Sequence, residues 1–201
     1  MSRELASAED GYVAGNPRWA GSDRLVVLSG CSGGGKSALL GEMAARGYPV
    51  FPEPGRQVVK EEALIGGGAL PATDPAAFAA RCIARAAYFF NVAEPGERAV
   101  FFDRSIVDAV TALARIGAVP APFAEAARRY RYGRRVFLVP PWPELFAADA
   151  ERQHGLAAAV AEYEALLASY PAHGYEVVVV PRASVAERAD FLEAAIREAA
   201  G

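Results

Sequence analysis

Residues 30–37 read GCSGGGKS and carry the clearest chemical signal in the chain, because they fit the pattern G-x-x-x-x-G-K-[ST]. In such a loop, successive backbone N–H groups point toward one anion, and the N-terminus of the following helix adds partial positive charge. Lys36 would bridge the β- and γ-phosphates of a nucleoside triphosphate, and Ser37 would offer its hydroxyl to Mg²⁺. The predicted phosphate-binding residues are Gly30, Cys31, Ser32, Gly33, Gly34, Gly35, Lys36 and Ser37.

Lysine is scarce in this sequence, which makes its use in the loop informative. The chain has 21 lysines and arginines together, and only Lys36 and Lys60 are lysines. Arginine serves almost wherever a surface cation suffices, whereas Lys36 stands where a compact ammonium group is needed. Cys31 is expected to fill space in the loop; the alternative is a thiol whose pKa is lowered by the helix N-terminus and that oxidises readily.

Two acidic residues follow apolar segments that are expected to be strands. Asp103 ends the run RAVFFD, where a solvated surface carboxylate is hard to explain, so we expect a functional role. Glu53 lies between two prolines, where it is either functional or an exposed turn residue. A carboxylate within hydrogen-bond reach of a substrate hydroxyl accepts its proton as a general base. Both carboxylates are therefore candidates for proton transfer.

Further features narrow the class of nucleotide-binding protein. The guanine signature Asn-Lys-x-Asp is missing from the sequence, and no Asp-Glu pair follows the apolar run 98–102, as it does in many ATP-hydrolysing motors. With 201 residues, the chain is also too short for the helical lid domain of AAA+ proteins. Instead, EPGR stands at 53–56 and DRS at 103–105.

These elements resemble the nucleoside and nucleotide kinase branch of P-loop proteins, which has an acidic-Pro element after its second strand and an acidic-Arg element after its Walker B strand. More closely, they resemble a family of small AAA-type P-loop ATPases similar to the ribosylnicotinamide kinase domain. The resemblance implies an α/β fold, the P-loop NTPase three-layer α/β/α sandwich with a five-stranded parallel sheet of order 2-3-1-4-5. The matching segments span residues 25–195 and are GCSGGGKS, EPGR, FFDRS, VFLVPPWPE, DAER and GYEVVVVPRASVAERADFL.

The resemblance also implies roles for individual residues. Glu53 matches the glutamate that accepts the proton of the hydroxyl being phosphorylated, and Asp103 matches the Walker B acid, which holds Mg²⁺ through water or orients the acceptor. Arg104 would contact the acceptor or a transferring phosphoryl oxygen. The two acids could exchange the role of base, and the sequence leaves that choice open. Arg56 and Lys60 either reach a phosphate or carboxylate of the substrate or are surface charges.

Residues 141–156 correspond to the lid of kinases with this architecture, which closes over ATP and supplies an arginine to the phosphoryl group. Arg152 is the candidate, with a helix-surface salt bridge as the alternative. Pro181 and Arg182 follow the last expected strand, where such folds hold the adenine ring, mostly through backbone atoms. Trp142 is expected to pack the lid rather than line the acceptor pocket.

Other conspicuous polar residues have simpler explanations. The five arginines of RRYRYGRR, at 128–135, are expected to belong to a basic helix end and loop; the alternative is a nucleic-acid patch. His154 and His173 have no companions at the spacing of metal ligands, so only Mg²⁺ bound with nucleotide is expected.

Alternating strands and helices must position these residues, which predicts right-handed βαβ units around a mainly parallel sheet. Residues 57–77 have a mixed pattern and are expected to form a loop near the substrate. Residues 1–23 are expected to form a flexible N-terminal arm, and 24–201 a single kinase-like domain. Strands are predicted at 24–30, in 48–56 and at 98–103, 134–139 and 176–181, and helices at 36–46, 75–92, 105–117, 123–131, 156–169 and 184–200.

The composition supports one globular domain. The chain has 201 residues, a net charge of −3 and 53% hydrophobic residues. It therefore has enough apolar side chains for a core and lacks the bulk positive charge of proteins that coat nucleic acid or anionic membranes. Two cysteines are too few for a secreted disulfide framework, and neither a signal peptide nor a transmembrane run is visible. We therefore expect a cytoplasmic protein, with its oligomeric state left open.

The residues together predict an ATP- and Mg²⁺-dependent phosphotransferase that acts on a hydroxyl of a small nucleoside-like or polar metabolite. The alternative is a nucleotide-dependent switch or regulatory ATPase with a protein or lipid partner. A kinase requires Glu53, Asp103 and Arg104 to converge on a closed cavity, whereas a switch would leave that side open, with an exposed mobile segment at 57–75. A polynucleotide end kinase would need the arginines of 128–135 to line a groove leading to Asp103.

Overall fold

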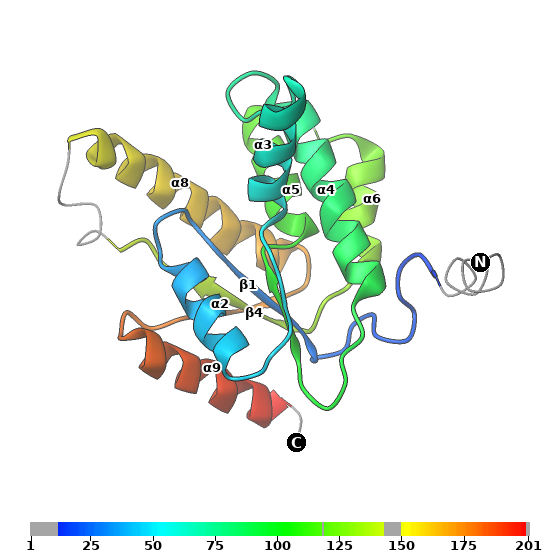
Figure 1. Cartoon of the computed structure of the whole chain (residues 1–201), viewed down its shortest axis with the longest axis vertical. Helices are drawn as coiled ribbons and strands as arrows, with labels where there is room; N and C mark the ends of the chain where they lie inside the picture. The colour runs from blue at the N-terminus through cyan, green and yellow to red at the C-terminus, as the bar shows by residue number, and fades with distance from the viewer. Residues whose placement is uncertain (1–11, 118, 143–149, 200–201) are drawn as a thin grey trace.

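Five short parallel strands form the centre of the computed structural model, which describes residues 12–117, 119–142 and 150–199. Their order in the sheet is β2-β3-β1-β4-β5, which confirms the order that the family resemblance implies (Figure 1). The strands are β1 (Leu25–Gly30), β2 (Val50–Phe51), β3 (Val100–Asp103), β4 (Arg135–Val139) and β5 (Glu176–Val179).

The register of the sheet brings the carboxyl ends of its central strands together. β1 is buried along its whole length, because strands pair with it on both sides and helices cover both faces. Leu28 of β1 is opposite Asp103 of β3, and Gly30 is opposite Val139 of β4. Asp103 therefore ends its strand beside the loop that leaves β1, at the edge where open α/β sheets bind ligands.

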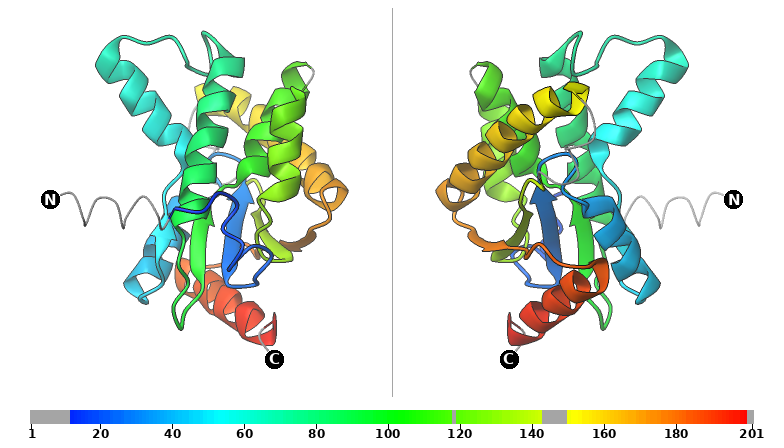
Figure 2. Two further views of the ribbon diagram at one scale, coloured as in Figure 1. Left: turned by 90° about the vertical axis from the view of Figure 1, so that its right-hand side faces the viewer. Right: turned by 90° about the vertical axis from the view of Figure 1, so that its left-hand side faces the viewer.

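Helices lie on both sides of the sheet and bury two hydrophobic clusters against it (Figure 2). One cluster includes Leu39, Met43 and Leu192, and the other includes Phe90, Ile106 and Tyr170. None of the helices in the described part of the chain combines the length and apolar character needed to cross a membrane. The first face carries α2 (Lys36–Ala45) and α9 (Val185–Ala199), and the second carries α4 (Pro75–Val92), α5 (Ile106–Ile116), α6 (Ala121–Arg129) and α8 (Ala150–Ala172).

The segment after β2 differs from the expectation of a loop over 57–77. Helix α3 (Pro54–Ile65) begins with a proline in its first turn and ends at Gly66, whose φ of 65° lies in the left-handed region that glycine adopts easily. Arg85 of α4 donates to the carboxylate of Glu61 at 2.8 Å and so ties α3 to α4. Much of the expected loop is thus a helix with fixed neighbours.

Most other elements agree with the expected ranges to within a few residues. The helix at 75–92 is confirmed at both ends, and the Asp74 side chain caps it by accepting from the N–H of Ala77 at 2.9 Å. The brief strand expected in 48–56 covers only β2, and α8 is longer than the expected 156–169.

The described part of the expected N-terminal arm, residues 12–23, is fastened to the domain. The buried Asn16 side chain donates to the carbonyls of Phe90 (2.9 Å) and Ala93 (2.8 Å). Trp19 packs against the hydrophobic cluster on the same face. These contacts join the segment to the end of α4.

Candidate active site

The loop between β1 and α2 has the tight backbone that its glycines predict. Gly30 has a φ of 128°, and a Cβ built there would lie 2.3 Å from the carbonyl oxygen of Val139, so only glycine fits. Gly35, with a φ of 80°, precedes the first turn of α2. The loop therefore runs directly into a helix N-terminus, the arrangement that binds phosphate.

Lys36 is buried at the start of α2, and its ammonium group lies inside the loop. Its Nζ donates to the carbonyls of Gly30 (2.9 Å) and Cys31 (2.7 Å). Burial lowers the pKa of Lys36, and the charge of Arg104 adds to that effect. The hydroxyl-bearing residue Ser37 follows it and is exposed.

Asp103 has a buried carboxylate oxygen with no hydrogen-bond partner among the described residues. The residue is 6% exposed, and the orphaned atom is Oδ1. Burial raises the pKa of Asp103 to about 6, although the charge of Lys36 acts to lower it. Buried polar atoms are nearly always hydrogen-bonded, so this oxygen is available to a bound water, ion or ligand. Together with the exposed hydroxyl of Ser37, it fits the oxygen ligands that Mg²⁺ prefers.

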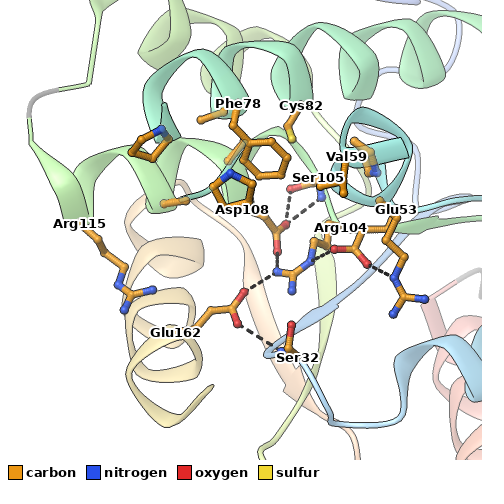
Figure 3. A pocket seen from close by; sticks show the side chains of 18 of the residues that line it. Ser32, Glu53, Val59, Phe78, Cys82, Arg104, Ser105, Asp108, Arg115 and Glu162 are labelled. Atoms are coloured by element: carbon orange, nitrogen blue, oxygen red, sulfur yellow. Dashed lines mark hydrogen bonds and ion pairs between the residues drawn. The ribbon is translucent and has the colours of Figure 1, made fainter. Parts of the chain in front are cut away.

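Arg104 is the hub of the polar network beside Asp103 (Figure 3). Its Nε donates to Glu53 Oε1 at 3.2 Å, and its Nη1 lies 2.8 Å from Glu162 and 3.4 Å from Asp108. Burial alone would lower the pKa of Arg104, but the three carboxylates more than offset it and raise the pKa. Its φ of 74° is costly for a residue with a side chain, which marks a position held by its surroundings.

Asp108 helps to hold Arg104 in place through the contact with its Nη1, and the sequence analysis missed this residue. Its Oδ1 accepts from the hydroxyl of Ser29 at 2.5 Å, and its Oδ2 accepts from the hydroxyl of Tyr170 at 2.5 Å and the N–H of Ser105 at 2.8 Å. The spacing of Ser105 and Asp108 matches a helix capping box, a signal that was available in the sequence.

Glu162 of α8 is the second residue that the sequence analysis missed, and no sequence signal points to it. Its Oε1 pairs with Arg104, and its Oε2 accepts from the backbone N–H of Ser32 at 3.2 Å. Figure 3 shows this carboxylate between the arginine and the loop. One of the predicted phosphate-binding amides is thus engaged by a side chain of α8.

A cavity of about 880 Å³ opens above this network, bordered by α3, α4, α5 and α8. Glu53 and Arg104 both line it, whereas Asp103 is not among its lining residues. Arg56 also lines it and holds Glu53 through an ion pair of 2.9 Å. Lys60 lies on its wall. The structure therefore brings the predicted Glu53, Arg56, Lys60 and Arg104 to one cavity.

The structure describes only part of the predicted lid and adenine site. Residues 143–149 lie outside the described residues, and so does the side chain of Arg152, whose backbone belongs to α8. Arg182 donates to the carbonyl of Pro141 at 2.7 Å, which joins the ends of β4 and β5. The half-buried Trp142 packs under the guanidinium of Arg188, at 5.7 Å from the ring centre.

Two further residues of this region differ from expectation. Cys31 is fully buried, and burial raises the pKa of its thiol. The alternative prediction, that the pKa of this thiol is lowered, is therefore wrong. Arg188 of α9 was missed, although it is only 2% exposed and donates to the carbonyl of Gly34 at 3.2 Å. It supports the phosphate-binding loop from the side of the C-terminal helix.

The arginines of 128–135 serve local contacts. Arg128 and Arg129 pair with Glu125, and Arg131 stacks on the ring of Tyr175 at 4.0 Å. None of these arginines is among the described residues that line the cavity.

Comparisons with known proteins agree with this fold. A family model described as an AAA domain matches residues 25–188. The NadR protein in complex with NR has a similar structure, with a TM-score of 0.50 and 19% identity over 87% of this chain; the chain spans half of the length of that protein. Deoxyadenosine kinase from M. mycoides with bound dATP has a TM-score of 0.48 and 13% identity, covering 86% of this chain and 98% of the kinase. No curated protein matches the sequence.

Proposed function

This chain belongs to the family of AAA domains, and from that membership we propose that it is an ATP- and Mg²⁺-dependent phosphotransferase acting on a hydroxyl of a small molecule. The cavity beside the phosphate-binding loop carries the proposal. Its volume of about 880 Å³ suits a small molecule, and Glu53 and Arg104 lie on its lining. A switch protein would instead present this side to a partner, whereas α3 here forms a fixed wall bound to α4.

The residues divide the work of phosphoryl transfer as follows. The loop amides and Lys36 hold the phosphates of ATP, and the acceptor hydroxyl approaches from the cavity. Its oxygen forms a bond to the γ-phosphorus while the bond from that phosphorus to the bridging oxygen of ADP breaks. Glu53 takes the hydroxyl proton, because it lines the cavity and Asp103 does not. Arg104 offsets the negative charge that spreads over the transferred group.

Asp103 and Ser37 are the residues that would hold Mg²⁺ with the nucleotide. The ion supplies charge neutralisation at the phosphate oxygens when it is bound. The unpartnered oxygen of Asp103 supports this assignment, since a buried carboxylate without a partner destabilises the protein unless a ligand uses it. Glu53 then remains for the proton, which separates two roles that the sequence leaves exchangeable.

The test is ADP production from ATP with Mg²⁺, measured with and without a panel of nucleosides, ribosides, sugars and aminoglycoside-like alcohols. We expect one class of alcohol to stimulate turnover strongly. Lys36→Ala should abolish turnover, and Glu53→Gln should lower kcat by about 10²–10⁴-fold while nucleotide affinity is retained. The matched control is Glu125→Gln, which alters an acid on α6 outside the cavity.

Slow hydrolysis that no alcohol stimulates, with tight nucleotide binding retained, would contradict the phosphotransferase. It would favour the nucleotide-dependent switch with a protein or lipid partner. Full activity of Glu53→Gln would contradict its role as the base and return that role to Asp103.

A further inference from the structure

The cavity has a polar floor and apolar walls. Figure 3 shows Phe78 and Cys82 of α4 above the carboxylates and the guanidinium of the floor. The thiol of Cys82 is buried, which raises its pKa to about 11, so it faces the cavity in its neutral form. The apolar part of the wall is formed by Val59, Phe78, Ala79, Cys82, Ala112 and Ile116.

The polar groups of the floor are already engaged with one another. Asp108 is held by Ser29, Ser105 and Tyr170, and the Ser105 hydroxyl also bonds to Tyr170 at 2.9 Å. In the proposed function, the reacting hydroxyl lies at the end of the cavity that Glu53 and Arg104 line.

The wall away from the floor has few groups that could recognise a nucleobase. Among the described lining residues there is no asparagine, glutamine, histidine, threonine or tyrosine, and the polar side chains beyond the floor are the exposed cations Arg56, Lys60 and Arg115. The Watson–Crick edge of a base carries two or three donors and acceptors. If this edge is buried without hydrogen-bond partners, it loses its bonds to water and weakens binding, whereas an apolar group of the same shape pays no such penalty.

We propose that the acceptor is an alcohol with an apolar body: its hydroxyl-bearing end meets Glu53, and its other end is an aryl or branched alkyl group packed against Phe78. This inference rests on the proposed phosphotransferase, and it replaces the nucleobase of a nucleoside-like acceptor with an apolar group. Phe78, Ala79 and Ala112 all line the cavity, and the ring of Phe78 offers an apolar face against which an aryl group can pack.

The experiment measures binding rather than turnover, so that it stands apart from the test of phosphoryl transfer. Phenyl β-D-ribofuranoside and uridine share the sugar and differ in the body, and each is titrated into the protein with ADP and Mg²⁺ by calorimetry. We expect the phenyl riboside to bind at least tenfold more tightly than uridine. Phe78→Ala should remove most of that advantage, and Ala112→Asn, which adds an unpaired amide to the wall, should lower the preference further.

Tyr88→Ala is the control, because Tyr88 is an exposed aromatic residue of α4 that does not line the cavity. Equal or tighter binding of uridine, binding of neither riboside, or a preference that Phe78→Ala leaves unchanged would overturn the inference. A phenyl preference with no phosphoryl transfer to any alcohol would leave the apolar slot standing and contradict the proposed function. Phosphoryl transfer to uridine with no preference for the phenyl riboside would support the proposed function and contradict the apolar acceptor.

Discussion

Asp103 keeps a carboxylate in a place where its charge is costly. Burial raises its pKa from 3.8 to about 6, so the folded protein binds this proton more tightly than the unfolded chain does. Between about pH 4 and 6 the folded state holds more protons, and the free energy of unfolding therefore falls as pH rises through that window. Above pH 6 the loss is complete and amounts to about 3 kcal/mol.

Asp103→Asn should therefore stabilise the protein at pH 7.5 in the absence of nucleotide, by up to about 3 kcal/mol, and should have much less effect at pH 4. Urea unfolding at the two pH values measures the difference. An equal change in the free energy of unfolding at both pH values would show that the carboxylate charge of Asp103 does not cause the stabilisation. The same variant should lose Mg²⁺-dependent nucleotide binding, which would make Asp103 a residue that trades stability for function.

At the residue scale, the sequence predicts the site only where the chemistry is local. The phosphate-binding loop is recognisable because its glycines, Lys36 and Ser37 are neighbours in the chain. Asp103 is recognisable because an apolar strand ends in a charge. Glu162 and Arg188 reach the loop from α8 and α9, and nothing in their own surroundings in the sequence marks them.

At the scale of elements, α8 connects to the phosphate-binding loop through one carboxylate. Glu162 accepts from the N–H of Ser32 and pairs with Arg104, so a phosphate that uses this amide must displace it. Glu162→Gln removes the negative charge with little change of shape. We expect the affinity for ATP to rise several-fold. The neutral side chain of glutamine competes less well than a carboxylate with the phosphate for the N–H of Ser32 and the guanidinium of Arg104.

Fluorescent-nucleotide titration measures this effect, with Glu164→Gln as the matched control on an exposed position of the same helix. An unchanged affinity for ATP in Glu162→Gln would mean that displacing the Glu162 carboxylate from the loop costs no binding free energy. Reduced affinity would mean that Glu162 helps to position Arg104 for the nucleotide instead.

The helices differ in how far their sequences reveal them. α4 is predicted at both ends because Asp74 caps it and its apolar residues repeat along one face. α3 is missed although both of its ends are marked, and only its fixed position against α4 depends on ion pairs that no local pattern displays. The proline at its start and Gly66 at its end were usable signals.

For the whole molecule, nucleotide binding should add directly to stability. A ligand present at 100 times its Kd and bound only by the folded state contributes about 2.7 kcal/mol. For a chain of this size, that corresponds to an increase of roughly 5–10 °C in Tm. We expect this shift with ADP and Mg²⁺ in thermal unfolding, its loss in Lys36→Ala, and its retention in Arg128→Ala, which changes an exposed cation on α6. A full shift in Lys36→Ala would contradict the role of the loop.

The parallel sheet is predictable from the sequence because strands and helices alternate along the chain, and its strand order is the one that the family resemblance implies. The acceptor cavity is not predictable in the same way. Its apolar wall is formed by side chains from α3, α4 and α5. The positions of these helices relative to one another depend on tertiary packing, which no local sequence pattern displays.

The contact between Arg188 and Gly34 joins residues that are 154 positions apart in the chain. During synthesis on a ribosome, β1 and its loop emerge long before α9. A nascent chain that ends before Arg188 has the complete phosphate-binding motif but not the arginine beneath it. We therefore expect the growing polypeptide to acquire full nucleotide affinity only when α9 has left the exit tunnel and docks beside α2.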